Sequence, residues 1–293
     1  MSVIGSNILS GASGQGGGYD IEQSVRYENS NSPFLSKTFS GDGNRRTFTI
    51  SLWFKTTCGG LDTNYLDYAW FYTAYGNDDN QARFQHQTTA YGQFIFQELV
   101  SNSATAMIAT AGKYRDPAAW YHVVLAIDTT QNDAADRAKI WVNGVEDGVI
   151  STAFPQNHQF TYWQQSSTVQ SVGRQMASGG GGTAYSRGYF AEYHYIDGSA
   201  LGPASFGETN ADTNQWQAIK YDGSYGTNGF YLKFQDTSAF GDDSSGNNND
   251  FASSGLVATD QVPDTPTNTF CNLNPLDGNG TYSEGNLKVV TSA

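Results

Sequence analysis

The feature that most constrains the fold is an almost uninterrupted apolar, aromatic and β-branched run at residues 120–127, Trp-Tyr-His-Val-Val-Leu-Ala-Ile. A run of this length, bounded by Asp-Pro and Asp-Thr-Thr, is typical of a strand that is buried on both faces. Residues 140–142 are a second strand, and Asn143-Gly144 then turns the chain, because this dipeptide tolerates the positive φ of a tight hairpin. This pattern predicts two stacked sheets that enclose Tyr121, Val123, Leu125 and Ile140.

The composition also favours sheets. Of 293 residues, 18 are Tyr and 17 are Phe, whereas only 3 are Met. Apolar residues make up 38% of the chain, enough for a sizeable core, and charged residues only 15%, well below the roughly 25% usual for globular domains. We predict an all-β fold, a two-sheet antiparallel jelly-roll sandwich, which a single domain of this length can form.

The charge of the chain limits its partners. Its 15 basic and 28 acidic residues give a formal net charge of −13. Nucleic acids and anionic membranes bind positive surfaces that displace counterions, so neither is expected as a partner. The sequence has no stretch of membrane-spanning length, and residues 1–20 lack the basic start and apolar core of a signal peptide. We therefore expect the chain to be made in a cytosol.

Three segments are expected along the chain. Residues 1–19 are rich in Gly and Ser, which predicts a flexible arm or one that orders on a neighbouring subunit. Residues 20–259 alternate strand-like runs with turn residues and form the sandwich. Residues 260–293 carry three prolines, which predicts an extended segment draped over the domain or leading away from it. Cys58 and Cys271 lack metal-ligand spacing, and two unpaired thiols are favoured over a disulfide.

Alternation identifies another strong strand. Thr47–Lys55 reads TFTISLWFK, in which Phe, Ile, Leu and Phe alternate with Thr, Ser, Trp and Lys. This period of two places the two sets on opposite faces of a strand. Pro203 predicts the start of a short helix, because proline is tolerated in a first turn. Further strands are predicted at residues 24–27, 34–38, 68–73, 82–88, 93–99, 104–110, 169–174, 187–196, 229–235 and 287–290.

Several motifs together carry a family resemblance. The Trp-Tyr-His-Val-Val strand, the Lys-Ile-Trp-Val-Asn-Gly hairpin and the later Gly-Tyr-Phe-Ala-Glu-Tyr-His-Tyr-Ile-Asp-Gly strand occur in this order. As a set they resemble a concanavalin A-like lectin/glucanase sandwich of the laminin-G-like type. With ASFGETNADTNQWQ, DSSGNNNDF and DTPTNTFCNLNPL, the chain is also similar to structural proteins of tailed phages, particularly those of marine and cyanobacterial hosts.

The resemblance implies a non-enzymatic protein of a virion fibre, appendage or surface decoration. It further implies a homo-oligomer such as a trimer, contact with other virion proteins through residues 1–19, and contact with host surface polysaccharide. Two alternatives remain open. The protein is purely architectural and binds no ligand, or it is a polysaccharide-degrading glycoside hydrolase of the same fold.

The sequence lacks the motifs of the catalytic members of this superfamily. Family glucanases carry a Glu-x-Asp-x-x-Glu strand whose paired carboxylates act as nucleophile and acid. The closest strand here contains Glu192 and Asp197, which are five residues apart and therefore on opposite faces of a regular strand. Glu192 is expected to accept a structural hydrogen bond. We therefore expect no catalytic residues.

Carbohydrate binding has better support in the sequence. Sugars bind to aromatic faces and to planar amide and carboxylate groups, and this chain is rich in all of them. Aromatic and polar residues in apparent loops are the candidates, although packing is the simpler explanation for any single aromatic. The candidate carbohydrate-binding residues are Tyr75, Asn77, Asp79, Tyr162, Trp163 and Tyr185.

An acidic loop at residues 242–250 offers a possible metal site. Ca²⁺ takes six to eight oxygen ligands, and Asp242, Asp243, Asn247 and Asp250 are its candidate ligands. The loop lacks EF-hand spacing, and a solvated turn rich in Asp and Asn accounts for the same residues without a metal. The solvated turn is the favoured interpretation.

Overall fold

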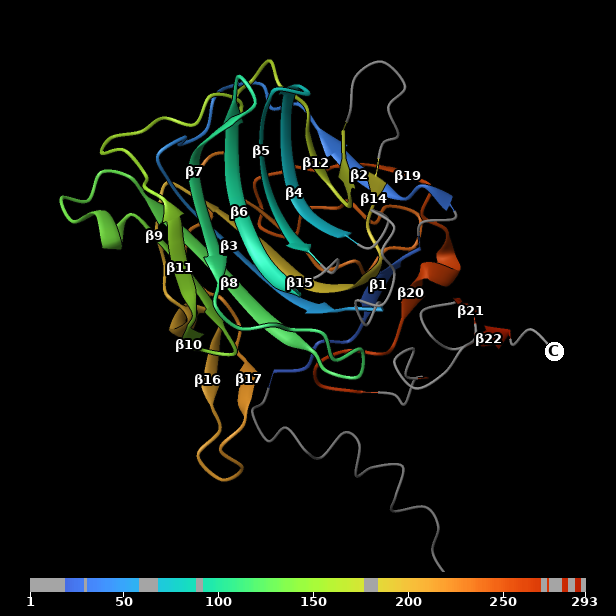
Figure 1. The fold of residues 1–293 in the computed structure, drawn as a ribbon. Helices are drawn as coiled ribbons and strands as arrows, with labels where there is room; N and C mark the ends of the chain where they lie inside the picture. Colours follow the sequence, from blue (N-terminus) through green and yellow to red (C-terminus); the bar gives the residue numbers. More distant parts are fainter. Residues whose placement is uncertain are drawn as a thin grey trace, which may run out of the picture.

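The protein folds into an antiparallel β-sandwich, as the sequence predicts (Figure 1). A computed structural model describes residues 19–28, 31–57, 68–87, 92–176, 184–269, 273, 281–283 and 288–290. Every strand pairing within these residues is antiparallel. Cys58, Cys271, the glycine-rich tip at 179–182 and residues 1–18 lie outside the described residues.

The first sheet contains the strand formed by the apolar run at residues 120–127. Its order is β10 (Val145–Glu146), β9 (Ala138–Val142), β8 (Tyr121–Asp128), β3 (Thr47–Lys55), β15 (Gly188–Asp197), β1 (Ser24–Tyr27) and β20 (Gln261–Val262), with β18 (Phe230–Leu232) also pairing with β15. Asn143 and Gly144 join β9 to β10 with φ values of 49° and 80°, so the predicted tight hairpin is confirmed.

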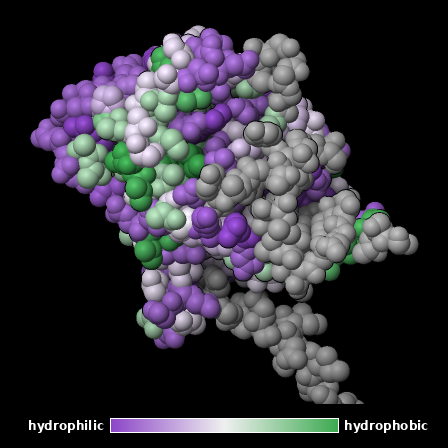
Figure 2. Space-filling model, viewed as in Figure 1, coloured by the Kyte–Doolittle hydropathy of each residue, from purple (hydrophilic) through white to green (hydrophobic). Residues whose placement is uncertain are grey.

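The second sheet covers one face of the first. Its order is β11 (Gly148–Thr152), β7 (Ser103–Thr110), β6 (Gln93–Val100), β5 (Asn80–Gln87), β4 (Tyr68–Asn77), β12 (Gln170–Val172), β2 (Phe34–Lys37) and β19 (Ala252–Ser254). Figure 1 shows β4 to β7 as long strands that curve together. Figure 2 shows that the face in this view is largely hydrophilic, with smaller hydrophobic areas.

Short elements complete the described fold. They are the hairpins β13 (Arg174–Gln175) with β14 (Ala184–Tyr185), β16 (Gly207–Thr209) with β17 (Trp216–Ala218), and β21 (Thr281–Ser283) with β22 (Lys288–Val290), and the 3-10 helices η3 (Ala134–Asp136), η4 (Pro203–Ser205) and η5 (Ala258–Asp260). The predicted helical turn at Pro203 is confirmed by η4. In the described part of the chain, no helix has the length and hydropathy needed to cross a membrane.

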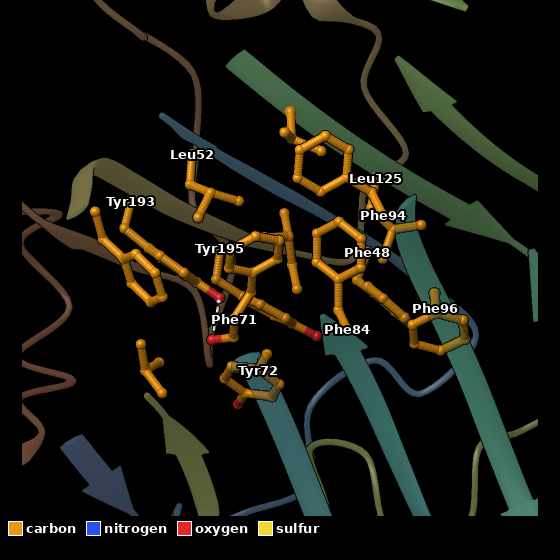
Figure 3. Close-up of a cluster of buried hydrophobic side chains, with 14 of the residues drawn as sticks. Phe48, Leu52, Phe71, Tyr72, Phe84, Phe94, Phe96, Leu125, Tyr193 and Tyr195 are labelled. Carbon is orange, nitrogen blue, oxygen red and sulfur yellow. Dashed lines mark hydrogen bonds between the residues drawn. The ribbon is translucent and has the colours of Figure 1, made fainter. Parts of the chain in front are cut away.

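Aromatic side chains fill the space between the two sheets. The ring of Phe48 stacks on that of Trp163 at 4.9 Å and on that of Tyr195 at 5.9 Å. The hydroxyl of Tyr193 donates to the carbonyl oxygen of Phe71 at 3.2 Å, so the tyrosine is buried with its polar atom satisfied (Figure 3). Val123, Leu125 and Ile140 are fully buried here, as predicted, and Tyr121 is partly buried against the same core.

The outer face of the first sheet is also covered, but by loops and a hairpin. One apolar cluster there contains Trp53, Trp120 and Ala218 with Trp216 packed against it, and another contains Val124 and Phe206. Strand β8 therefore directs Val123 and Leu125 into the sandwich and Val124 into the outer layer. This explains why residues 120–127 are apolar on both faces.

Residues 260–269, the described first part of the segment after residue 259, pack against the domain. Strand β20 pairs with β1, and Asp264 lies beneath it as the partner of a fully buried Lys55, with a Nζ–Oδ2 distance of 2.8 Å. The other carboxylate oxygen of Asp264 accepts a hydrogen bond from Trp120 Nε1 at 3.2 Å. Residues 260–269 thus continue the sandwich, and the boundary expected at 260 is not a break in the packing.

We predict that Leu125→Ala lowers the free energy of unfolding by about 2–5 kcal/mol, because it leaves a cavity between the sheets. Val145→Ala is the control, since Val145 is 69% exposed and its truncation should change stability by less than about 0.5 kcal/mol. Urea unfolding followed by tryptophan fluorescence measures both. Equal effects of the two substitutions would contradict the burial of β8.

Candidate functional site

A depression on the outer face of the first sheet is lined by three tryptophans. Its volume is about 640 Å³. We call it the tryptophan groove, and its lining residues are Trp53, Ala118, Ala119, Trp120, Asn143, Asn214, Gln215, Trp216, Pro266, Thr267 and Thr269. None of these side chains carries a formal charge, although the protein as a whole has a net charge of −13.

The three tryptophans come from different structural elements. Trp53 belongs to the set of β3 residues that alternates with the core-facing phenylalanines, so it points to the outer face. Trp120 immediately precedes β8, and Trp216 begins β17. A Cβ atom added at Gly144 or Gly207 would come within 2.4 Å or 2.5 Å of the Trp216 ring. The ring therefore occupies a slot that only glycines leave open.

A buried histidine connects two of these tryptophans. The His122 ring lies 4.9 Å from that of Trp53 and stacks on that of Trp216 at 5.9 Å. Trp216 Nε1 donates to His122 Nδ1 at 3.0 Å, and His122 Nε2 lies 2.9 Å from Ser51 Oγ. Burial, with a smaller contribution from His194, lowers the pKa of His122 to about 3. The ring is therefore neutral, and Nε2 carries its proton.

The groove combines apolar ring surface with side-chain amides at its rim. Asn214 and Gln215 are exposed, and Asn143 is partly exposed with its Oδ1 accepting from the backbone N–H of His122 at 2.8 Å. Thr269, another exposed residue of the lining, adds a hydroxyl group. Ring faces and edges with convergent amides and hydroxyls are the groups that bind uncharged sugars.

The predicted glycan-binding residues of the β4–β5 turn lie together with Tyr162. Asn77 and Asp79 are exposed at this turn, and Tyr75 is partly exposed beside them. A Cβ atom at Gly76 would lie 2.3 Å from the Tyr162 ring, so this tyrosine packs directly on the turn. Several polar atoms here already serve the turn itself: Asn77 Oδ1 accepts from the backbone N–H of Asp79 at 3.1 Å, and Tyr75 donates to Asp78 at 2.7 Å.

Trp163 and Tyr185 do not belong to this group. The prediction that Trp163 faces a glycan is wrong, because the side chain is fully buried between the sheets and its Nε1 donates to Tyr195 at 2.9 Å. Tyr185 lies on β14, where the neighbouring Ser186 contacts Trp70 near the start of β4. Tyr75 lies toward the other end of β4, about five residues or roughly 16 Å away along the strand.

The residues of the acidic loop do not fit a calcium site. The Asp243 carboxylate accepts from the backbone N–H groups of Tyr231, Ser245 and Asn249 at 2.8–2.9 Å. Asn247 directs its amide nitrogen, a donor, to the carbonyls of Gly226 and Gly229, and Asp250 accepts from the backbone of Asp243. Asp242 is exposed. Within the described ranges, no group of three or more His, Cys, Asp or Glu residues is arranged to hold a metal ion.

Glu192 has the structural role that the sequence predicts. It lies at a bulge of β15 with φ of 47°, and its carboxylate accepts hydrogen bonds from Tyr19 at 2.8 Å and Tyr231 at 2.6 Å. Burial opposes ionisation, but hydrogen bonds from His194, Tyr231 and Tyr19 prevail and lower the pKa of Glu192 below its ordinary value. Asp197 instead accepts from the backbone N–H groups of Asn44 and Asn228.

Sequence reasoning missed the tryptophan groove, although one signal pointed to it. The alternation of Thr47–Lys55 places a large aromatic, Trp53, on the face opposite the core. A tryptophan on that face needs a cover or a ligand. Its partners Trp120 and Trp216 come from segments much further along the chain. Only the folded chain brings them together.

We predict that acidification destabilises the protein between about pH 6.5 and pH 4. Burial lowers the pKa of His86 to about 4 and that of His122 to about 3, whereas an unfolded histidine titrates near 6.5. The unfolded chain therefore takes up protons that the folded chain does not, and stability falls as pH falls. The free energy of unfolding, measured with urea at pH 7, 6 and 5, should fall as the pH falls. His86→Gln should reduce the slope of this free energy against pH by up to about 1.4 kcal/mol per pH unit.

Solved structures match this chain at low sequence identity. A candidate carbohydrate-binding protein from Bacteroides ovatus is 14% identical, with 80% of this chain and 58% of that chain covered and a TM-score of 0.43. The CBM40 domain of Ruminococcus gnavus IT-sialidase, bound to α2,3 sialyllactose, is 15% identical over 64% of this chain and 92% of that chain, with a TM-score of 0.38. Tailspike protein 2 of the Escherichia coli O157:H7 bacteriophage CAB120 is 12% identical over 62% of this chain and 23% of that chain, also with a TM-score of 0.38.

The sequence itself identifies the family. No curated protein matches the chain. Residues 29–205 match the family model of the concanavalin A-like lectin/glucanases superfamily. This match spans more than half of the 293 residues and covers most of both sheets. The chain belongs to the concanavalin A-like lectin/glucanases superfamily.

Proposed function

We propose that this chain is a non-enzymatic carbohydrate-recognition protein of a phage virion. In this proposal the tryptophan groove holds an uncharged stretch of host surface polysaccharide. The virion assignment rests on the resemblance of ASFGETNADTNQWQ, DSSGNNNDF and DTPTNTFCNLNPL to structural proteins of tailed phages. The carbohydrate assignment rests on the groove.

The observation that carries the proposal is the chemistry of the groove lining. Three indoles, three side-chain amides and two threonines surround about 640 Å³, with no charged side chain among them. In a protein with a net charge of −13, acidic side chains are expected on most surfaces that are exposed to water. Their exclusion from this lining favours a neutral ligand with both apolar ring faces and hydroxyl groups, which describes a sugar.

Two buried groups that resemble catalytic residues have structural roles, which supports a non-enzymatic protein. Ser51 and His122 lie at hydrogen-bonding distance, but the Nδ1 of His122 accepts from Trp216. Its Nε2 therefore donates to Ser51 and cannot take the serine proton, as a general base would have to do. Glu192 is 8% exposed, and its carboxylate already accepts hydrogen bonds from the hydroxyls of Tyr19 and Tyr231.

A purely architectural role is the second candidate, and one observation favours it. Trp53 and Trp120 are only 4% and 8% exposed. Their rings therefore also hold β17 and residues 264–267 against the first sheet. The two roles differ in what they require of exposed residues at the groove rim, since packing does not depend on Gln215, whereas ligand binding does.

We predict that Gln215→Ala and Trp216→Ala weaken binding to neutral host polysaccharide by about tenfold and about 10- to 100-fold, respectively. Thr213→Ala, in the same β16–β17 turn but outside the groove lining, should bind like the unaltered protein. Glycan arrays followed by titration calorimetry measure this. Undiminished binding by Gln215→Ala and Trp216→Ala would exclude the groove, and no binding by the unaltered protein would favour the architectural role.

The non-enzymatic proposal has its own test. Incubation of the protein with host capsule or β-glucan should release no reducing ends above those of a heat-denatured sample. Release of reducing ends would instead establish the glycoside hydrolase alternative. Alanine substitution of Glu192 would then show whether this buried carboxylate takes part.

We further propose that the protein is a homo-oligomer, with a trimer expected, that contacts other virion proteins through residues 1–19. Analytical ultracentrifugation at micromolar concentration should give about three times the 31.8 kDa chain mass. Deletion of residues 1–18, which keeps the hydrogen bond from Tyr19 to Glu192, should leave glycan binding unchanged and abolish incorporation into particles, scored by immunogold microscopy. A monomer at all concentrations, or particles decorated by the deleted chain, would contradict this assembly.

A further inference from the structure

We propose that the outer face of the second sheet carries a separate site that binds the carboxylate of an acidic sugar through Arg83, with Arg174 beside it. This site is on the opposite side of the sandwich from the tryptophan groove. It does not depend on the function proposed for that groove.

Strand pairing places the site residues in two adjacent rows. In the first row, Trp70 on β4 pairs with Gln85 on β5, and Gln85 pairs with Ile95 on β6. In the second row, Arg83 lies between Thr73 on β4 and Gln97 on β6. Directly paired residues of antiparallel strands point to the same face. The guanidinium of Arg83 lies over the Trp70 ring, 5.5 Å from its centroid, and joins the two rows.

Arg83 has no carboxylate partner among the described residues. Its hydrogen-bond partner is the amide oxygen of Gln97, which accepts from Arg83 Nε at 2.8 Å once the amide is oriented with its oxygen toward the arginine. Burial lowers the pKa of Arg83 to about 10, so the group is still charged at neutral pH. A desolvated cation without a counter-charge is costly, and an anion that pairs with it is correspondingly favoured.

The strands around Arg83 contain almost no negative charge. Strands β4, β5, β6 and β7 carry one carboxylate, that of Glu98. Glu98 is fully buried, its strand partner Ala106 lies in the core, and its oxygens bind His158 and the backbone N–H of Thr161. The chain has 28 acidic residues, yet this face of the sheet presents a partly exposed arginine and no carboxylate. Its local charge is therefore positive, whereas the net charge of the protein is negative.

A second arginine approaches the same face. Ser171 on β12 pairs with Thr73, and Arg174 Nε donates to Ser171 Oγ at 3.3 Å. Two strand spacings, roughly 10 Å, therefore separate the backbone of Arg83 from that of Ser171, the residue that Arg174 contacts. The Arg174 guanidinium lies 3.5 Å from the centroid of the Phe34 ring, and no described carboxylate pairs with it. Both arginines thus combine a charge with an aromatic surface.

Two unsatisfied polar atoms lie in the same row. Trp70 Nε1 and Gln85 Oε1 are buried and have no hydrogen-bond partner, and both side chains are at least nine-tenths buried. An unpaired buried donor and an unpaired buried acceptor each cost free energy, so this layer beneath Arg83 is polar but not fully satisfied. Trp70 also stacks on Tyr68 at 4.9 Å, which extends the aromatic surface beside the arginine.

The shape of the charged group favours a carboxylate. A guanidinium donates two parallel hydrogen bonds to a planar carboxylate, whereas an ammonium acts as a point charge. Polyanions of high charge density, such as nucleic acids, are disfavoured by the net charge of −13. A polysaccharide with one carboxylate per sugar presents its anions singly, and its rings can pack beside Tyr68, which is partly exposed.

The test uses the full chain and two forms of one polymer. Alginate is the probe, and its carboxyl-reduced derivative is the matched ligand, identical except that each carboxylate is a neutral hydroxymethyl group. The unaltered protein should bind alginate at least tenfold more tightly than the reduced polymer, and this preference should shrink as NaCl is raised. Equal affinity for the two polymers, or binding only to a sulfated polymer such as dextran sulfate, would overturn the carboxylate assignment.

Three variants locate the site. Arg83→Gln should weaken alginate binding by about 10- to 100-fold. Arg83→Lys should restore only part of the lost affinity, because lysine keeps the positive charge but not the two parallel N–H donors of the guanidinium. Lys220→Gln, which removes the same unit charge from a side chain that is 72% exposed, is the control and should bind normally. Full alginate binding by Arg83→Gln would overturn the proposal. Trp216→Ala should also keep alginate binding, so failure of either site is distinguishable from failure of the other.

Thermal unfolding separates binding from a structural role. Because Arg83 is a desolvated charge without a carboxylate partner, Arg83→Gln should leave the melting temperature unchanged or raise it. A structural arginine would behave in the opposite way, and a large drop in melting temperature together with lost binding would assign Arg83 to the fold. Raised stability with lost alginate binding is the combination expected of a residue kept for its ligand.

Discussion

Everything else in the structure depends on the burial of the first sheet on both faces. Strand β8 sends Val123 and Leu125 into the space between the sheets and Val124 to the other side. The second sheet covers one face, but the β16–β17 hairpin, η4 and residues 264–267 must cover the other. Because irregular segments cannot pack as continuously as a sheet, a depression is left where Trp53, Trp120 and Trp216 meet.

Polar groups within this outer layer hold its loops in place. Lys55 is fully buried and pairs with Asp264, which also accepts from Trp120. His122 links Ser51 to Trp216, and Glu192 collects the hydroxyls of Tyr19 and Tyr231. Since a buried polar group is costly unless it is paired, each contact ties one distant segment to one position on the sheet. Residues that resemble catalytic groups are thus explained by the needs of the fold.

The two outer faces of the sandwich differ in charge. The tryptophan groove has no charged residue in its lining, whereas Arg83 on the second sheet and Arg174 on the adjoining β13 have no described carboxylate partner. In an acidic protein, both patterns depart from what solubility alone requires. In the two proposals together, the tryptophan groove selects neutral sugars and the Arg83 site selects acidic sugars, each independently of the other.

The amino-acid sequence by itself determined the sheets. The alternation of Thr47–Lys55, the apolar run at 120–127 and the Asn143-Gly144 turn are local signals, because strand period and turn φ depend on neighbouring residues. It did not determine which aromatics face solvent. Trp163 was expected in a binding loop and is fully buried, while Tyr162 beside it packs on the β4–β5 turn. Only the tertiary structure decided that question, and with it both candidate sites, because their residues come from strands and loops far apart in the chain and side-chain exposure is set by whatever packs above.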